Sequence, residues 1–295
     1  MCLYKDTQII SICKSETMKG TTFSFILFAA TCGNLVYSDH VVRTRMIGGE
    51  PIGSPLPYIA GIKHLVKNIS VKFCLGSVIG SRWILSSALC LLTTDPKNVV
   101  VDLGVRIQSP NPSPNRYHTS KIIIHPNFNS TTGKNDIALL QVSQSIKFTD
   151  SLSPVKLGHF RKEKVTELTA IGWNDDVDHG LGHGKPEGYQ LARLKLTIIS
   201  IDECQNKFPE LNDLVSLDET QICGYDGEGK DMCGVDYGGP AIDEQNKEQV
   251  GVFNDVIFYA NGHGHDCHPH HNHPLVFTKV EIYLSWIRET TNLQL

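Results

Sequence analysis

The segment that decides the fold reads DMCGVDYGGP and occupies residues 231–240. Upstream, WILSSALC occupies residues 83–90 and NDIALL occupies residues 135–140. Two shorter segments, MIGG at 46–49 and AIGW at 170–173, complete a set of five. Around these segments, short apolar runs alternate with clusters of Gly, Pro, Asn and Ser. This alternation indicates many short strands and is typical of an all-β sandwich or barrel.

The five segments resemble signatures of the trypsin-like serine proteases, in the order found in that family. The segment at 231–240 is similar to the family's DxCxGDSGGP, and the segment at 83–90 is similar to its W[IV]L[ST]AAHC. The resemblance extends from Met46 to about Thr291. It implies an all-β fold of two six-stranded antiparallel β-barrels, followed by a C-terminal α-helix.

The resemblance also implies a first barrel at about residues 46–155 and a second at 156–295. Strands are expected where short apolar runs lie between turn residues, for example at 83–85, 99–103, 121–124, 137–142 and 249–253. One helix is expected at 280–291, where the family has its closing helix. Its apolar residues recur at helical spacing and predict a face that packs on the body: Ile282, Tyr283, Trp286 and Ile287.

Hydrolysis in this family uses a serine that attacks, a histidine that takes its proton, and an aspartate that orients the histidine. The aspartate position is kept as Asp136, but Leu89 stands at the histidine position and Tyr237 at the serine position. Leucine accepts no proton, and a tyrosine hydroxyl without an adjacent base keeps its proton up to a pKa of about 10. Loss of such a unit typically lowers turnover about a millionfold. The sequence therefore predicts a homologue without catalysis.

The positions that surround the substrate have also changed. The resemblance places Asp231 at the base of the specificity pocket, where it would favour Arg or Lys substrates. Val256 and Leu275 stand for family glycines, and their side chains are expected to fill the pocket. Val235 stands for a glycine that forms the oxyanion hole, where a β-branched residue disfavours positive φ; an altered loop that keeps the N–H is the alternative. Asn254 replaces a serine and is expected to satisfy the triad aspartate.

Residues 39–45 read as a short polar propeptide. The junction between Arg45 and Met46 resembles the site at which zymogens of the family are cut, and Asp236 is the aspartate that pairs with the freed amine. A buried ion pair of this kind can bias a switch between two loop arrangements. We therefore expect zymogen-style maturation whose ordered form binds partners; inherited scaffolding without a regulatory use is the alternative.

Residues 1–38 are expected to be a leader that contains a secretory signal peptide. From Met18 a basic start is followed by the apolar run 23–30, which is too short to span a bilayer, and small residues permit cleavage after Ser38. We expect translation to start at Met18; a long polar n-region is the alternative. Removal of the leader leaves an even number of cysteines, which suits an oxidising compartment.

The remaining cysteines and two sequons fit a secreted chain. The sequence alone allows many pairings of these cysteines. The resemblance selects three pairs: Cys74–Cys90, Cys204–Cys223 and Cys233–Cys267. The sequons at Asn68 and Asn129 predict glycosylation on surface loops.

A histidine-rich segment, GHGHDCHPHHNH, occupies residues 262–273. Exposed imidazoles suit Zn or Cu, with His268, His270 and His271 as candidate ligands. A metal-binding secreted protein is therefore one alternative function. The loop lacks the fixed geometry of a structural zinc site, and the simpler interpretation is a solvated loop that becomes cationic below about pH 6.5. No other cofactor is expected.

The composition narrows the function further. A net charge of −4 disfavours nucleic-acid binding, which needs a basic stripe. The chain is 40% hydrophobic and 20% charged, as expected of a globular protein without a membrane span. We interpret it as a secreted, extracellular, catalytically inactive trypsin-like homologue that acts by protein binding or regulation in a proteolytic cascade. Its expected partners are cascade proteases or their substrates. An active trypsin-like serine endopeptidase is the alternative.

Overall fold

The computed structural model describes residue 46 and residues 48–67, 69–108, 112–161, 165–174, 189–208, 216–227, 230–232, 236–254 and 273–295. For residues 70–72, 108, 174 and 189 it describes the backbone alone. The chain divides into a unit Met1–His40 and a compact unit Val41–Leu295. The leader, the propeptide with Arg45, and several candidate site residues lie outside the described residues: Asn68, Cys233, Val235, Val256, Cys267, His268, His270 and His271.

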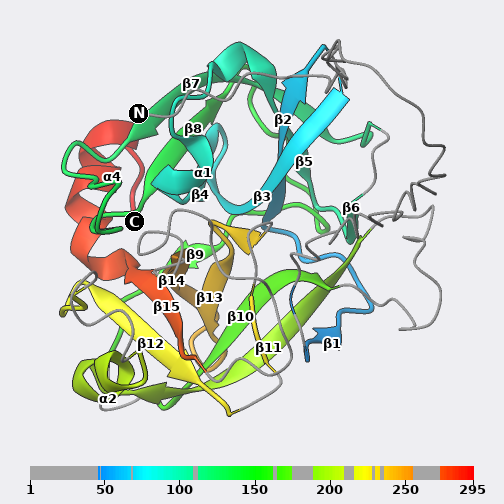
Figure 1. The fold of residues 1–295 in the computed structure, drawn as a ribbon. Helices are drawn as coiled ribbons and strands as arrows, with labels where there is room; N and C mark the ends of the chain where they lie inside the picture. Colours follow the sequence, from blue (N-terminus) through cyan, green and yellow to red (C-terminus); the bar gives the residue numbers. More distant parts are fainter. Residues whose placement is uncertain are drawn as a thin grey trace, which may run out of the picture. The chain divides into compact units, whose positions relative to one another are not determined.

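Six antiparallel strands close the first barrel in the order β2-β3-β4-β8-β7-β5 (Figure 1). They are β2 (Ile59–Val66), β3 (Ile69–Gly80), β4 (Trp83–Ser86), β5 (Val99–Leu103), β7 (Arg116–Ile124) and β8 (Ala138–Val142). The cross-strand register points apolar side chains inward, because Ile62 lies opposite both Cys74 and Val101, and all three are fully buried.

The second barrel is closed because β11 and β12, the two ends of its strand order, pair with each other. Strand β11 pairs with both β10 and β12, and the remaining order is β10-β13-β14-β15-β12. These strands are β10 (Glu167–Asn174), β11 (Tyr189–Ile199), β12 (Gln221–Tyr225), β13 (Pro240–Asp243), β14 (Glu248–Asn254) and β15 (Leu275–Lys279). Three short strands extend this sheet: β1 (Glu50–Pro51), β6 (Ile107–Gln108) and β9 (Lys156–Leu157). The predicted fold of two six-stranded antiparallel barrels is confirmed.

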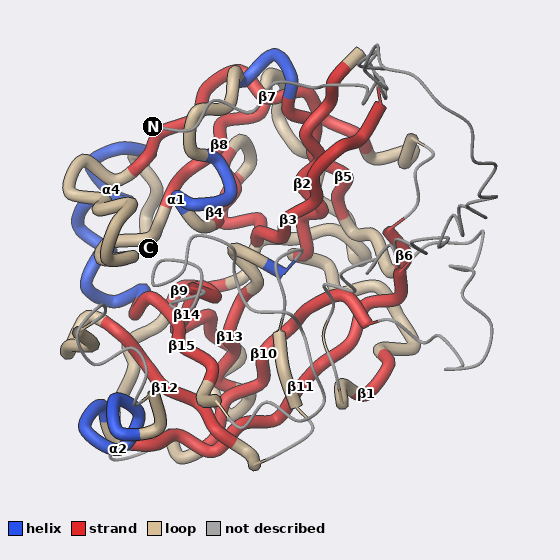
Figure 2. The backbone as a smooth tube through the Cα atoms, viewed as in Figure 1, coloured by secondary structure: helices blue, strands red, loops and turns tan. Residues whose placement is uncertain are grey.

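The C-terminal helix is confirmed, with one difference in its first turn. A 3₁₀ turn, η4 (Val280–Tyr283), follows β15 and leads into the α-helix α4 (Leu284–Thr291), which lies beside the first barrel in Figure 2. Tyr283 and Ile287 are buried, as expected, but Ile282 is 51% exposed. The tighter 3₁₀ turn changes which side chains face inward, and Leu284 is buried in place of Ile282.

Two short helices were not predicted. Helix α1 (Ala88–Leu91) begins after Ser87, whose Oγ accepts a hydrogen bond from the N–H of Cys90 at 3.1 Å. Helix α2 (Ile201–Asn206) begins after Ser200, whose Oγ accepts from the N–H of Glu203 at 3.1 Å. The Ser-x-x-Glu spacing is an N-terminal capping signal and would have predicted α2.

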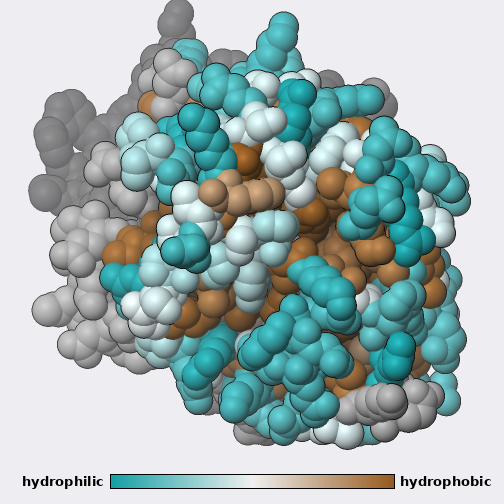
Figure 3. Space-filling view, turned by 180° about the vertical axis from the view of Figure 1, so that it is seen from behind, coloured by the Kyte–Doolittle hydropathy of each residue, from teal (hydrophilic) through white to brown (hydrophobic). Residues whose placement is uncertain are grey.

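Two disulfides and two large hydrophobic clusters hold the described part of the fold together. The pairs Cys74–Cys90 and Cys204–Cys223 are present, as the resemblance implied. Each of these two clusters contains side chains from both barrels, so the barrels share their core, whereas a third, smaller cluster lies within the second barrel. Seen from behind, hydrophobic surface shows between hydrophilic side chains (Figure 3). No helix in the described part of the chain has the length and apolarity needed to cross a membrane.

A buried ion cluster links three neighbouring strands of the first barrel. Asp102 of β5 accepts two hydrogen bonds from Arg116 of β7, at 2.7 and 2.8 Å, and lies 2.7 Å from the ammonium of Lys63 of β2. The side chains of Asp102 and Lys63 are only 2% and 3% exposed. Burial raises the pKa of the Asp102 carboxyl, but the hydrogen bonds and charges of Arg116 and Lys63 outweigh it, and the net pKa is lowered.

Candidate functional site

The residues at the histidine and serine positions are packed into a single apolar cluster. Helix α1 carries Leu89, which is 7% exposed, and the turn after Asp236 carries Tyr237, which is 8% exposed. Both belong to the same hydrophobic cluster. The Tyr237 ring stacks on Phe253 with centroids 6.4 Å apart. The structure therefore brings the two positions into one core, where a leucine offers no atom that accepts a proton.

The retained aspartate lies against the same helix. Asp136 is fully buried, and its Oδ1 accepts a hydrogen bond from the backbone N–H of Leu89 at 2.8 Å. Its backbone oxygen accepts from Thr278 Oγ1 at 3.0 Å. The contact between Asp136 and Leu89 is thus made through the leucine backbone.

Asn254 does not take the role expected from the sequence. Its Nδ2 donates to the backbone oxygen of Gly133 at 3.0 Å and to Thr278 Oγ1 at 3.3 Å. The amide has two hydrogens, and both are used by these acceptors. Asn254 therefore satisfies a loop carbonyl and a threonine, and the prediction that it donates to the Asp136 carboxylate is wrong.

The turn that carries Tyr237 depends on close backbone contacts. Gly238 has φ +84°, and a Cβ there would lie 2.9 Å from the nitrogen of Ser87 and closer still to Ser86 Oγ and the oxygen of Leu75. The N–H of Leu75 donates to the oxygen of Tyr237 at 2.9 Å, and Ser86 Oγ donates to the oxygen of Leu75 at 2.6 Å. Leu75 and Ser86 support this turn and were not among the predicted site residues, although Ser86 lies inside the segment at 83–90.

Two of the predicted specificity-pocket positions are described, and both are buried. Asp231 is 4% exposed, and its Oδ1 accepts from the N–H of Met232 at 2.9 Å. Leu275 begins β15, is 5% exposed, and belongs to the same apolar cluster as Leu89 and Tyr237.

The residues of the predicted activation switch lie together. Met46 is 1% exposed, and its N–H donates to the oxygen of Trp173 at 3.0 Å. Asp236 is fully buried, and its Oδ1 accepts from the N–H of Trp173 at 2.6 Å. A Cβ on Gly172 would lie 2.6 Å from Met46 Cε and 2.8 Å from Asp236 Oδ1. Met46 and Asp236 therefore flank the same glycine.

Tyr283 lies close to the triad aspartate. Its hydroxyl donates to Asn135 Oδ1 at 3.0 Å. Burial, followed by the negative charges of Asp218 and Asp136, raises the pKa of Tyr283 to about 12. Tyr283 therefore stays protonated and acts as a hydrogen-bond donor at neutral pH.

Two of the described histidines, His64 and His125, have contacts with a disulfide and with aromatic rings. His64 Nε2 lies 3.6 Å from Cys90 Sγ, and its Nδ1 lies 3.3 Å from Thr94 Oγ1. His64 forms a three-ligand grouping with Cys74 and Cys90. Because the two sulfurs are joined in a disulfide, they are not thiolate ligands, and the grouping does not fit a metal. His125 packs edge-on against Tyr283 and its pKa is lowered by burial.

The sequence model described as Trypsin matches residues 48–287. The chain belongs to the trypsin family. Among its relatives, Trypsin II-P29 of Gallus gallus is 32% identical over 271 residues, which cover 91% of this chain and 98% of that protein. Glucanase inhibitor protein 3 of Phytophthora infestans is 29% identical over 86% of this chain and 91% of its own length.

A solved structure supports the same assignment. The HL collagenase structure superimposes with a TM-score of 0.67 at 27% sequence identity, covering 84% of this chain and 100% of that chain. A collagenase of Hypoderma lineatum is also similar in sequence, with 28% identity over 84% of this chain. The trypsin family consists of serine endopeptidases, so the residues at the triad positions decide which activity this member can have.

Proposed function

We propose that this protein is a secreted, catalytically inactive member of the trypsin family that acts by binding proteins in an extracellular proteolytic cascade. The observation that carries the proposal is the single apolar cluster that contains both Leu89 and Tyr237. A serine protease needs a proton acceptor and a hydroxyl nucleophile at these positions. Here the Asp136 carboxylate accepts a hydrogen bond from the backbone N–H of Leu89, and the side chain at this position has no imidazole.

Further observations support a role in binding. Leu275 is buried, and because it stands for a family glycine its side chain is expected to narrow the space in which a trypsin holds a basic side chain. One relative carries the name glucanase inhibitor protein, which denotes inhibition of another protein. The two disulfides suit an oxidising, extracellular compartment. We expect cascade proteases and their protein substrates to be the partners of this protein.

The proposal predicts that the purified protein does not turn over trypsin substrates. Hydrolysis of an arginine ester should lie about a millionfold below that of an active trypsin measured alongside, because both the base and the nucleophile are replaced. A serine-directed phosphonate should leave the protein unlabelled in the same assay. Turnover that scales with protein concentration, together with stoichiometric labelling, would show instead an active endopeptidase, the function that family membership favours.

The positions of Met46 and Asp236 support a zymogen-style switch. Cleavage after Arg45 by a trypsin-like protease should free an amine at Met46 that pairs with the Asp236 carboxylate. The cut form should then unfold at a higher temperature than the proform, because the freed amine adds a buried ion pair with the Asp236 carboxylate. The variant Asp236→Asn should remove this difference while still being cut. Failure to cut at Arg45, or a cut without structural change, contradicts the switch.

Metal binding by the histidine-rich loop remains an alternative proposal. Its candidate ligands His268, His270 and His271 lie outside the described residues.

A further inference from the structure

The disulfide of the first barrel has a histidine beside it. Cys74 lies on β3, Cys90 on α1 and His64 on β2. His64 Nε2 lies 3.6 Å from Cys90 Sγ, and the ligand atoms of the three residues all lie within 4.8 Å of one another. The two cysteines are fully buried, and His64 is 7% exposed. Three elements of the first barrel therefore meet at one cluster of nitrogen and sulfur atoms.

Thr94 determines which nitrogen of His64 carries the proton. The Thr94 hydroxyl donates its one hydrogen to the backbone oxygen of Leu92 at 3.3 Å. It also lies 3.3 Å from His64 Nδ1, so it accepts a hydrogen bond from Nδ1–H. In the neutral imidazole the other nitrogen then holds a lone pair, and this nitrogen, Nε2, is the one beside Cys90 Sγ. Histidines that bind metals are commonly oriented by such a partner on their second nitrogen.

The donor set suits zinc only when the two sulfurs are thiolates. While the disulfide is closed, it offers no thiolate to a metal. A dithiol reductant supplies two electrons and two protons: the S–S bond breaks, two thiols form, and the reductant becomes a disulfide. Zn²⁺ can then displace both thiol protons and take the lone pair of His64 Nε2. Two thiolates and one imidazole are a three-ligand set that zinc accepts in tetrahedral sites with an open fourth position.

We propose that Cys74, Cys90 and His64 bind zinc when the disulfide is reduced. The metal then links β2, β3 and α1, and it replaces the covalent link between β3 and α1. Burial of the cluster is compatible with this role, because structural zinc is bound as the chain folds and its binding free energy stabilises the fold. Helix α1 also carries Leu89, so the metal would hold the candidate functional site in place. The proposal does not depend on whether the chain is catalytic.

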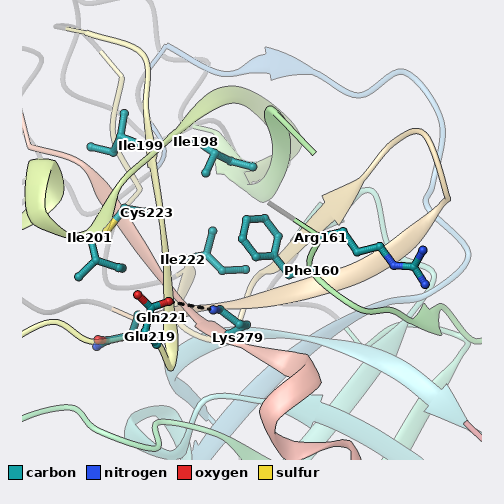
Figure 4. A pocket seen from close by; sticks show the side chains of 10 residues that line it. All are labelled: Phe160, Arg161, Ile198, Ile199, Ile201, Glu219, Gln221, Ile222, Cys223 and Lys279. Carbon is teal, nitrogen blue, oxygen red and sulfur yellow. Dashed lines mark ion pairs between the residues drawn. The ribbon is translucent and has the colours of Figure 1, made fainter. Parts of the chain in front are cut away.

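The other described disulfide provides a control within the same molecule. Cys223, the partner of Cys204, lies in the wall of a cavity of about 300 Å³ on the second barrel, near Ile199 and Ile201 (Figure 4). No histidine is among the described residues that line this cavity. In the described part of the chain, neither cysteine belongs to a three-ligand grouping. We therefore expect zinc to have no effect on this pair.

Alkylation of the reduced full chain, with and without Zn²⁺, tests the site. The chain is reduced anaerobically with dithiothreitol, the reductant is removed, and mass spectrometry of peptides reports each cysteine separately. Zn²⁺ should slow the alkylation of Cys74 and Cys90 at least about tenfold, because a ligand in excess over its dissociation constant protects the state that it binds. Thr94→Val should raise the zinc concentration for half-maximal protection about 10- to 100-fold, because the partner of Nδ1 is lost. His64→Leu should raise it further, because the ligand itself is lost.

His118→Leu is the matched control, because His118 is an exposed histidine of β7 that does not belong to the grouping. Its protection should equal that of the wild type, and zinc held by the histidine-rich loop does not alter this residue-resolved readout. No slowing by zinc, equal slowing at Cys204 and Cys223, or protection that survives in both His64→Leu and Thr94→Val overturns the proposal.

The test also decides if folding is impaired. If the reduced chain is unfolded without metal, Zn²⁺ should restore its circular dichroism and protect the same two cysteines, Cys74 and Cys90, because binding and folding are coupled. Failure to do either refutes the site. If His64→Leu does not fold even with its disulfides closed, Thr94→Val decides alone: weaker protection supports the site and unchanged protection refutes it.

Discussion

Gly238→Ala is expected to destabilise the protein far more than Gly227→Ala. Both glycines have φ +84°, so each alanine carries the same backbone penalty of about 1–2 kcal/mol. At Gly227 a Cβ would have no heavy atom within 4 Å in the described chain, whereas at Gly238 it would press on Ser86, Ser87 and the oxygen of Leu75. Overpacking of this kind adds about 1–3 kcal/mol.

Equilibrium unfolding in guanidinium chloride, with the disulfides intact, measures both losses. The free energy of unfolding should fall by about 2–5 kcal/mol in Gly238→Ala and by about 1–2 kcal/mol in Gly227→Ala. The difference between the variants isolates the steric contribution, because the backbone conformation is shared. Equal losses would mean that the turn carrying Tyr237 adapts to a methyl group, and that its tight packing is unimportant for stability.

The second large effect is expected at the buried ion cluster. Asp102→Asn should lower the free energy of unfolding by about 3–5 kcal/mol, because it leaves the nearly inaccessible Lys63 ammonium without its carboxylate. The control is Asp218→Asn, which breaks the pair with Lys134. The side chains of that pair are 38% and 40% exposed, so the loss should stay below about 1 kcal/mol.

The same cluster predicts a dependence on pH. The pKa of the Asp102 carboxyl is lower in the folded than in the unfolded protein, so the folded state binds fewer protons. Its contribution to stability is therefore complete above the unfolded pKa of about 3.9 and is lost as the pH falls through the folded pKa. In acid titrations of stability the wild type should have a steeper decline than Asp102→Asn below about pH 4. If stability falls with pH equally in the wild type and in Asp102→Asn, Asp102 is not the cause of the acid destabilisation.

Adding Lys63→Met to Asp102→Asn should recover part of the lost stability, because it removes the uncompensated charge while keeping the apolar stem. A double variant as unstable as the single one would point to lost packing instead of buried charge.

The fold could be predicted because its signatures are local. The strand pattern indicates a sandwich or a barrel, and the resemblance of the five short segments to the trypsin-like family implies the two barrels. The spacing of apolar residues, together with the family's closing helix, predicts the helix at the C-terminus. The exposure of Ile282 could not be predicted, because it depends on whether the first turn is a 3₁₀ or an α turn. The Ser-x-x-Glu spacing at Ser200 is also a local signal, and it indicates the start of α2 from the sequence alone.

The candidate site was predictable only in part. The motifs placed Leu89, Asp136 and Tyr237 at the triad positions, whereas the partners of Asn254 depend on where the oxygen of Gly133 lies after folding. The ion cluster joins Lys63, Asp102 and Arg116, which are separated along the chain and meet only across three paired strands. Such long-range polar contacts have no local sequence signature.

The shared core around Leu89 and Tyr237 has a consequence for how this chain evolves. An active protease must keep polar, water-accessible groups at the seam between its halves, and such functional groups are generally held at a cost in stability. Here Leu89 and Tyr237 belong to a hydrophobic cluster that contains residues of both barrels. Mutations elsewhere on the surface, including those that create new contact faces, can then accumulate with less risk of unfolding.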